Sequence, residues 1–131
     1  MTDNFKLSVT IPAKPEDVYS AWLDSKKHGA MTGSEAIVDP KINGAFTAWD
    51  GYIEGRTIEI EHNNRIVQKW RTTGFPSDSP DSIVEILFEG SKNGTKMILI
   101  HTEIPEGQGE EYRKGWKEFY FDPMKAYFKS E

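Results

Sequence analysis

The chain has 131 residues, with 16 Lys and Arg against 21 Asp and Glu, so its formal net charge is -5 at pH 7. This length suits one domain, which we expect over residues 1–131. The acidic balance argues against nucleic acid as a partner, because binding phosphates needs a basic surface. The absence of cysteine excludes disulfides and thiolate chemistry, and together with the lack of a signal peptide or an apolar membrane span it predicts a cytoplasmic protein.

The first third of the chain predicts one strand followed by two helices. Residues 5–11 alternate apolar and polar side chains, which is the pattern of a half-buried strand. Pro15 suits the first turn of a helix. The apolar face of that helix consists of Val18, Tyr19, Trp22 and Leu23. A second, short helix is expected over residues 24–30 and should end near Gly29 or Gly33.

From residue 35 onward the sequence changes to strands joined by tight turns. Asn43-Gly44, Asp50-Gly51 and Asn93-Gly94 are dipeptides typical of short turns. The strands expected between these turns and the loops span residues 36–38, 45–49, 52–61, 65–71, 82–89 and 95–104. Because successive strands joined by short turns pair as neighbours, we expect an antiparallel meander.

Residues 108–129 predict a long helix with one large aromatic face. Spacings of three and four relate Tyr112, Trp116, Phe119, Tyr120, Pro123, Met124 and Tyr127. Pro123 should kink this helix or restart it at about Asp122. Since such an aromatic face needs a broad apolar surface, the order of elements predicts an α+β fold in which a curved antiparallel sheet holds the helix on one face.

Four motifs along the chain resemble a known family. They are Asn43-Gly44-Ala45-Phe46, Asp50-Gly51-Tyr52, Arg65-Ile66-Val67-Gln68-Lys69-Trp70-Arg71 and Gly115-Trp116-Lys117-Glu118-Phe119-Tyr120. In this order they resemble the C-terminal domain of the heat-shock protein 90 ATPase activators and their single-domain bacterial relatives, within the START-like, or SRPBCC, superfamily. The resemblance runs from about Phe5 to Phe128. It implies the helix-grip fold, a cavity for an apolar ligand, and a chaperone as one partner.

The titratable residues do not form a recognisable catalytic or metal-binding motif. The three histidines, His28, His62 and His101, lack the spacing of a metal site. We expect His28 and His62 to be solvated, and His101 to be a hydrogen-bonded residue on the core side rather than a ligand contact. No serine motif or carboxylate pair points to catalysis. The sequence therefore predicts no metal and no cofactor, and it identifies no catalytic residue.

Aromatic residues are numerous for a domain of this size. Most should belong to the core, where each buried side chain contributes roughly 1.5–3 kcal/mol. The alternative is a pocket for a flat or oily molecule, because such pockets have apolar walls with few polar groups. Tyr120 and His101 would supply those polar groups. The pocket candidates are Trp22, Phe46, Trp49, Trp70, Phe88, Leu99, His101, Trp116, Phe119 and Tyr120.

Gly115 stands inside the long helix, where glycine costs about 1 kcal/mol relative to alanine. We expect it to allow close approach of the sheet or of the first two helices. On this interpretation Gly115→Leu would overpack the interface and lower the melting temperature by several degrees.

The outer face of the sheet carries apolar residues as well. Leu87, Ile98 and Ile100 should lie together there, although one-sided antiparallel sheets usually present polar residues to water. We call these three residues the outer patch, and we interpret it as a contact for a partner or a second copy. The chain would accordingly be a monomer or a homodimer.

These observations favour a non-enzymatic domain that binds a small hydrophobic molecule between the sheet and the C-terminal helix. The resemblance adds a stress- or chaperone-related role. Two alternatives stay open. One is a protein-interaction module similar to the chaperone ATPase activators. The other is an enzyme of the polyketide-cyclase type, in which Tyr120, His101 or a glutamate would assist the reaction of a hydrophobic substrate.

Overall fold

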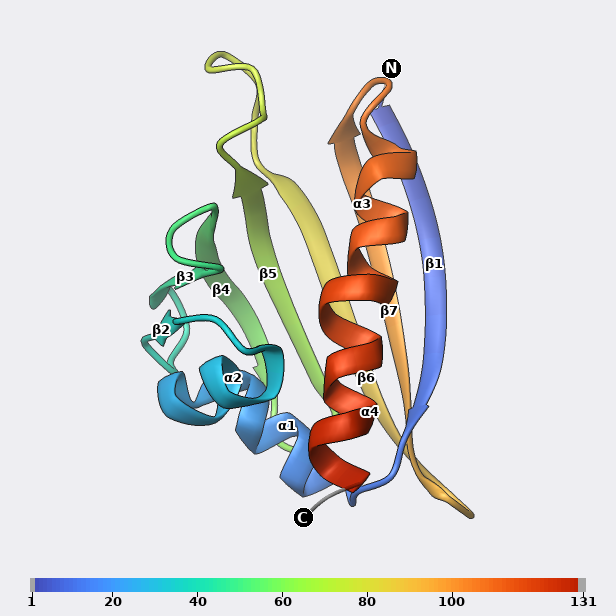
Figure 1. Ribbon diagram of the computed structural model, residues 1–131. Coiled ribbons are helices and arrows are strands. Elements are labelled where there is room, and N and C mark those ends of the chain that lie inside the picture. The colour runs from blue at the N-terminus through green and yellow to red at the C-terminus, as the bar shows by residue number, and fades with distance from the viewer. Residues whose placement is uncertain (1, 130–131) are drawn as a thin grey trace.

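A seven-stranded antiparallel sheet forms the framework of the computed structural model, which describes residues 2–129 (Figure 1). Its strands are β1 (Thr2–Ile11), β2 (Ile37–Val38), β3 (Ala45–Ala48), β4 (Ile53–Glu61), β5 (Arg65–Thr72), β6 (Ser82–Ser91) and β7 (Gly94–Pro105). Their order across the sheet is β1-β7-β6-β5-β4-β3-β2. The predicted meander is confirmed from β2 to β7, and β1 pairs with β7 at the far edge.

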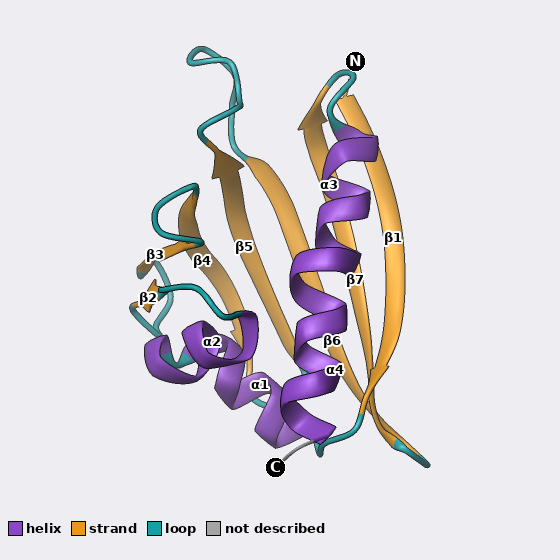
Figure 2. Cartoon of the chain, viewed as in Figure 1, coloured by secondary structure: helices purple, strands orange, loops and turns teal. Residues whose placement is uncertain are grey.

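The helices all lie on one side of this curved sheet. They are α1 (Pro15–Leu23), α2 (Ser25–Thr32), α3 (Gly109–Trp116), the π-helical segment η1 (Lys117–Phe121) and α4 (Asp122–Lys129). Figure 2 shows α3, η1 and α4 continuing as one rod along the sheet, with α1 and α2 near its lower end. This arrangement confirms the predicted α+β helix-grip architecture. No helix within residues 2–129 has the length and apolar character needed to cross a membrane.

The alternation of buried and exposed residues explains why the sheet holds the helix on one face only. In β6, Val84, Ile86 and Phe88 are buried toward the helix, and Met97 and Leu99 of β7 are fully buried beside them. Because successive strand residues point to opposite faces, the intervening residues reach the outer surface. The apolar core therefore lies between the sheet and the helical layer.

The outer patch is on the face where the sequence placed it, but it offers little exposed area. Leu87 lies opposite Ile98 in the ladder. Leu87 and Ile100 are half-buried, and Ile98 is only 7% exposed. Beside them Arg65, which pairs with Leu87 across the sheet, bonds to Glu59, Glu61 and Glu85. The use of this patch by a dimer or partner stays a prediction.

Pro123 determines how the C-terminal helix is built. A proline lacks an N–H, and its ring collides with the carbonyl four residues earlier. The helix widens before it: the Asp122 N–H donates to the Lys117 carbonyl, five residues back, and α4 starts at Asp122. The predicted restart is confirmed. The widened segment leaves Phe119 52% exposed while Tyr120 and Phe121 are buried.

Candidate ligand-binding site

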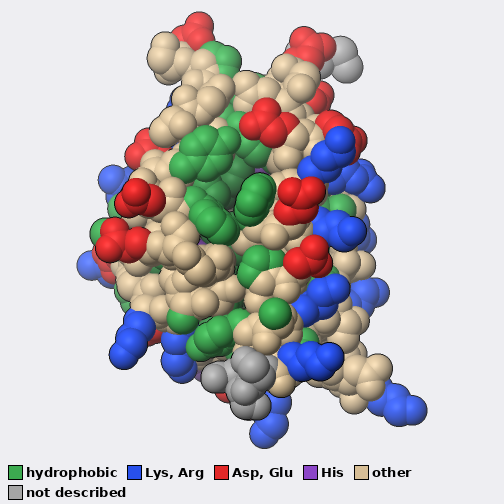
Figure 3. Space-filling view, viewed as in Figure 1, with side chains coloured by type: hydrophobic (Ala, Val, Ile, Leu, Met, Phe, Trp, Pro, Cys, Tyr) green, Lys and Arg blue, Asp and Glu red, His purple; other side chains and the backbone are tan. Residues whose placement is uncertain are grey.

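A cavity of about 140 Å³ lies between the C-terminal helix and the strands β4 and β5. Seven of its nine lining residues are aromatic, and none is charged. They are Trp49, Tyr52, Ile53, Trp70, Tyr112, Gly115, Trp116, Phe119 and Tyr120. The space-filling view shows apolar side chains gathered in the middle of this face, with acidic side chains around them (Figure 3). The cavity can therefore accept an apolar, uncharged molecule.

The mouth of the cavity is formed by rings from two elements. Phe119 comes from η1 and Trp49 from the turn between β3 and β4, and their ring centroids are 5.5 Å apart in an edge-to-face arrangement. Tyr52, at the end of the same turn, is 41% exposed. Phe119 is 52% exposed, so Phe119 and Tyr52 are the rings of the wall that solvent reaches.

The turn behind the mouth has an unusual backbone. Trp49 has φ of 53°, Asp50 of 57° and Gly51 of 87°, so three successive residues are left-handed. Glycine and aspartate tolerate this conformation, but a bulky residue such as tryptophan rarely adopts it. The Tyr52 N–H donates to the Trp49 carbonyl at 3.1 Å, and the Asp50 N–H donates to the Glu35 carbonyl at 3.3 Å. These bonds hold Trp49 at the cavity.

The inner wall is a cluster of stacked rings. Trp116 lies between Trp70, at a centroid distance of 5.6 Å, and Tyr120, at 4.8 Å. Trp22, from α1, packs behind them at 6.1 Å from Trp116 and at 5.0 Å from Tyr120. Such offset and tilted pairs are favourable geometries for aromatic rings, so the cluster makes a firm wall for the cavity.

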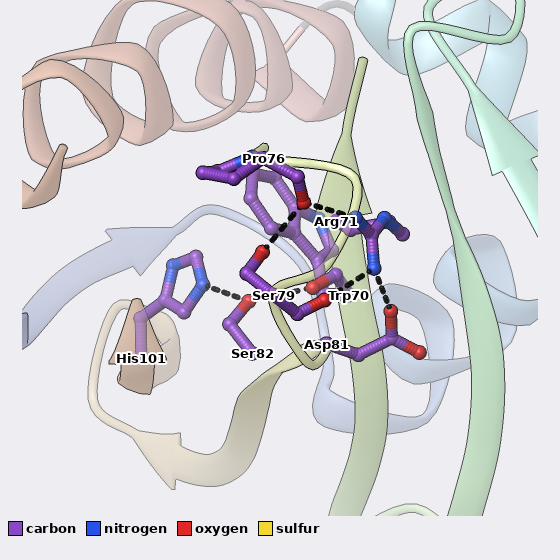
Figure 4. A network of polar contacts seen from close by, with 7 residues as sticks. All are labelled: Trp70, Arg71, Pro76, Ser79, Asp81, Ser82 and His101. Carbon is purple, nitrogen blue, oxygen red and sulfur yellow. Dashed lines mark hydrogen bonds and ion pairs between the residues drawn. The ribbon is translucent and has the colours of Figure 1, made fainter. Parts of the chain in front are cut away.

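His101 fixes the inner wall from the sheet side. The Trp116 indole N–H donates to His101 Nδ1 at 3.0 Å. The imidazole therefore carries its proton on Nε2, which donates to Ser82 Oγ at 2.8 Å, and Ser82 in turn donates to the Trp70 carbonyl. The Ser82 contacts are drawn in Figure 4, beside the bonds of Arg71 with Asp81, Ser79 and Pro76. Burial lowers the pKa of His101 to about 3.

His101 matches the expectation of a hydrogen-bonded core residue, whereas the expectation for His28 was wrong. His28 is only 3% exposed. Since a carbonyl can only accept, His28 Nδ1–H donates to the Trp22 carbonyl at 2.8 Å, and Nε2 accepts from the Tyr120 hydroxyl at 2.9 Å. Burial lowers the pKa of His28 and raises the pKa of Tyr120. His62 is exposed, as expected.

The hydroxyl of Tyr112 is also turned away from the cavity. It donates to Gln108 Oε1 at 2.8 Å and lies 2.7 Å from Thr72 Oγ1. Burial raises the pKa of Tyr112 to about 12. Because the polar atoms of Tyr112, Trp116 and Tyr120 are all bonded to protein partners, their rings present carbon surface to the cavity. These three groups therefore do not present an acid or a base to the cavity.

Trp49 is the exception. Among residues 2–129, its Nε1 is the one buried side-chain nitrogen or oxygen that has no hydrogen-bond partner. Leaving a buried donor unpaired costs about 1–3 kcal/mol. The wall of the cavity therefore includes one residue with an unused hydrogen-bond donor.

Half of the pocket candidates from the sequence line the cavity. Trp49, Trp70, Trp116, Phe119 and Tyr120 do so. The other five, Trp22, Phe46, Phe88, Leu99 and His101, are buried but do not line it. Of these, Phe46 borders a separate hollow lined by residues of β3, β4 and β5.

Sequence reasoning missed four lining residues, namely Tyr52, Ile53, Tyr112 and Gly115. Tyr112 was on the predicted aromatic helix face, and that face was the signal that could have found it. The expectation for Gly115 was wrong in its reason. A Cβ added there would meet only the Phe119 ring, at 3.9 Å. Gly115 leaves space for the cavity and does not permit a close approach of the sheet.

No group of three His, Asp or Glu side chains suited to a metal ion occurs within the described chain.

Comparisons with known proteins agree with the fold. The family model described as "Activator of Hsp90 ATPase homolog 1-like protein" matches residues 12–129. The Activator of 90 kDa heat shock protein ATPase homolog 1 of Homo sapiens is 25% identical over 127 residues, which are 97% of this chain and 37% of that protein. The Dictyostelium discoideum homolog is 29% identical over 128 residues, or 97% and 33%. The chain thus spans about a third of the length of these curated relatives.

Solved structures give the same result. An HSP90 activator from Plasmodium falciparum superposes with a TM-score of 0.85 and 27% identity, over 94% of both chains. DynU16, a putative protein in the dynemicin biosynthetic locus, has a TM-score of 0.79 over 97% of this chain and 47% of its own, but its 17% identity supports the fold alone. On the match over residues 12–129, the chain belongs to the Activator of Hsp90 ATPase homolog 1-like protein family.

Proposed function

We propose that this domain binds a small hydrophobic molecule in the cavity between the sheet and the C-terminal helix. The observation that carries the proposal is the aromatic cavity of about 140 Å³. An apolar cavity of about 150 Å³ in another protein stays dry and binds benzene. The present volume suits a molecule of one ring, and displacement of the exposed Phe119 ring would make room for a second.

Binding has more support than acid–base catalysis. A general acid or base must reach the reacting atom by a hydrogen bond. His101 and Tyr120 are two of the groups named for the enzyme alternative, with a glutamate as the third. His101 accepts from Trp116 and donates to Ser82, and Tyr120 donates to His28. A substrate in the cavity would meet the face of the Tyr120 ring, and His101 lies behind Trp116.

Titration with indane, an uncharged hydrocarbon of suitable size, tests the proposal. In a ¹H–¹⁵N spectrum, the indole N–H signals of Trp49, Trp70 and Trp116 should shift, with the smallest change at Trp22. Native mass spectrometry of the purified protein should in addition detect any hydrophobic molecule that is retained. Unchanged indole signals at millimolar indane would overturn the proposal.

A matched pair of variants tests whether indane binds in the cavity. Gly115→Leu fills the cavity, since the position has open space around it, and should weaken indane binding at least about tenfold, because a filled cavity excludes the ligand. Lys114→Leu, an exposed change on the same helix, should leave the affinity unchanged. Equal affinity in both variants would mean that indane binds elsewhere.

A second candidate function is stimulation of an Hsp90-class chaperone. It is favoured by the match to the Plasmodium falciparum HSP90 activator, which covers 94% of both chains. The test is the rate of ATP hydrolysis by Hsp90 from the source organism, measured with and without a molar excess of this protein. A higher rate supports a chaperone partner, whereas an unchanged rate leaves ligand binding as the function.

A further inference from the structure

Trp49 combines three features that occur together at no other lining residue of the cavity. It borders the cavity, its backbone is left-handed, and its indole N–H is buried without a partner. Strained residues persist where the surrounding structure fixes them, and they cluster at ligand clamps. The left-handed conformation of Trp49 costs conformational free energy, and the turn keeps its indole at the mouth of the cavity despite this cost.

Two of the three other tryptophans have an indole N–H bonded within the protein, whereas that of Trp70 has no such bond and is not fully enclosed. Trp22 Nε1 donates to Gln68 at 3.2 Å, and Trp116 Nε1 donates to His101 at 3.0 Å. Buried polar groups in native proteins are nearly always bonded, and an exception often marks a functional group. The missing partner of Trp49 is best supplied by a molecule in the cavity.

We propose that Trp49 Nε1–H determines ligand specificity, and that the ligand is an uncharged aromatic molecule carrying a hydrogen-bond acceptor such as a ketone oxygen. This inference rests on the proposed binding function and names the class of its ligand. Trp49 donates to the acceptor, while the rings of Trp70 and Trp116 contact the apolar part. The atom is closed off in the empty cavity, so its exposed neighbour Phe119 moves aside when the ligand enters.

The lining argues against other ligand classes. A carboxylate or an amine would be buried with no opposite charge among the nine lining residues, and an unpaired buried charge is strongly unfavourable. A ligand with only donors would need an acceptor. The hydroxyls of Tyr112 and Tyr120 lie against Thr72, Gln108 and His28, so a ligand in the cavity meets the faces of these rings and not their oxygens.

The test compares indane with 1-indanone, which has nearly the same shape and adds one carbonyl oxygen. The unmodified protein should bind 1-indanone about three- to tenfold more tightly, which is the range one buried hydrogen bond provides. Trp49→Phe keeps an aromatic ring but removes the donor, and should bind both compounds with similar affinity. Lys114→Leu, an exposed change outside the lining, should keep the preference and is the control.

A second readout does not depend on a variant that folds. The Trp49 Nε1–H proton should move farther downfield with 1-indanone than with indane, because only the ketone accepts a hydrogen bond. If both compounds bind equally to the unmodified protein, or if Trp49→Phe keeps the preference, this inference is overturned while the binding function stands. If neither compound binds, both fail.

Discussion

The C-terminal helix has two sides that differ in how they treat polar atoms. On the side we call closed, Trp22, His28, Gln68 and His101 are buried, and their side chains are hydrogen-bonded. On the side we call open, Trp49, Tyr52, Gly115 and Phe119 surround a cavity. There one indole donor is unpaired and two rings are exposed.

The closed side stabilises the fold, whereas the residues of the open side are not tied into such a network. Gln68 shows the closed side well: it accepts from Trp22 Nε1 and donates to Thr57 Oγ1 at 3.1 Å. A buried network in which every polar group is hydrogen-bonded is rigid. Removing one member leaves another buried polar group without a partner. The open side has no such network to lose. Changes to the closed side should therefore alter stability, and changes to the open side should alter binding.

Acid should weaken the closed side most. Unfolded histidine has a pKa near 6.5, whereas burial holds folded His101 near 3 and lowers the pKa of His28. Between these values the unfolded chain binds the extra proton, so stability present above pH 6.5 is lost as pH falls. From pH 7 to 5 the free energy of unfolding should drop by about 2 kcal/mol through His101 alone, with His28 acting in the same direction.

Urea denaturation at the two pH values measures this drop. His62→Gln changes the exposed histidine and should leave the pH dependence as it is, whereas His101→Leu should reduce it. A free energy of unfolding that stays constant between pH 7 and 5 would contradict the buried neutral state of both histidines.

His101→Leu at pH 7 removes the acceptor for Trp116 Nε1–H, while Ser82 keeps the Trp70 carbonyl as its own acceptor. The unpaired indole should lower the free energy of unfolding by about 1–3 kcal/mol. Phe119→Leu on the open side is the comparison and should have a smaller effect, because that ring is half exposed. Equal losses in thermal denaturation would erase the distinction between the sides.

Gly115→Leu should raise the free energy of unfolding by about 1 kcal/mol, since glycine is a poor helix former and the new side chain enters open space. This is the opposite of the effect expected from the sequence. Gly115→Ala should give a similar gain without filling the cavity, because alanine is the best helix former. A lower melting temperature in both variants would mean that the helix approaches its neighbours more closely than described.

Asp50→Gly should give the smallest effect. Asp50 is exposed with φ of 57°, where glycine has no steric penalty and aspartate a modest one. We expect a gain of about 0.5 kcal/mol in the free energy of unfolding. Asp78→Gly, in an exposed loop without positive φ, is the control and should give no gain. Equal results would show that the turn at Trp49 is not strained.

The fold could be predicted because its signals are local. Strand alternation, turn dipeptides and the aromatic helix face each depend on residues within a few positions, and Pro123 acts on the turn directly before it. His28 could not be placed this way. It follows Lys26 and Lys27 in a polar stretch, and its burial depends on Tyr120, 92 residues away.

The site was predictable in kind but not in detail. Many large rings in a small domain favour a cavity. Their spacing in the sequence does not predict which rings line the cavity and which pack fully in the core. Whether Gly115 faces a neighbour or a space is decided by how far the helix stands from β4 and β5. The left-handed turn was expected at Asp50-Gly51, but its extension to Trp49 depends on the long-range bond from Asp50 to Glu35.

The widened segment η1 also sets the rotational phase of the helix. Tyr112, Trp116, Tyr120, Met124 and Phe128 are all buried, at a constant spacing of four residues. With 3.6 residues per turn, each such step overshoots a straight stripe by about 40°, and four steps would carry the last ring nearly to the opposite side. One turn with an extra residue cancels much of this drift. Removing a single residue from η1 would therefore restore ordinary α-helical winding without rotating α3 against α4. It would also bring the carbonyl four residues earlier against the ring of Pro123, which the wide turn avoids.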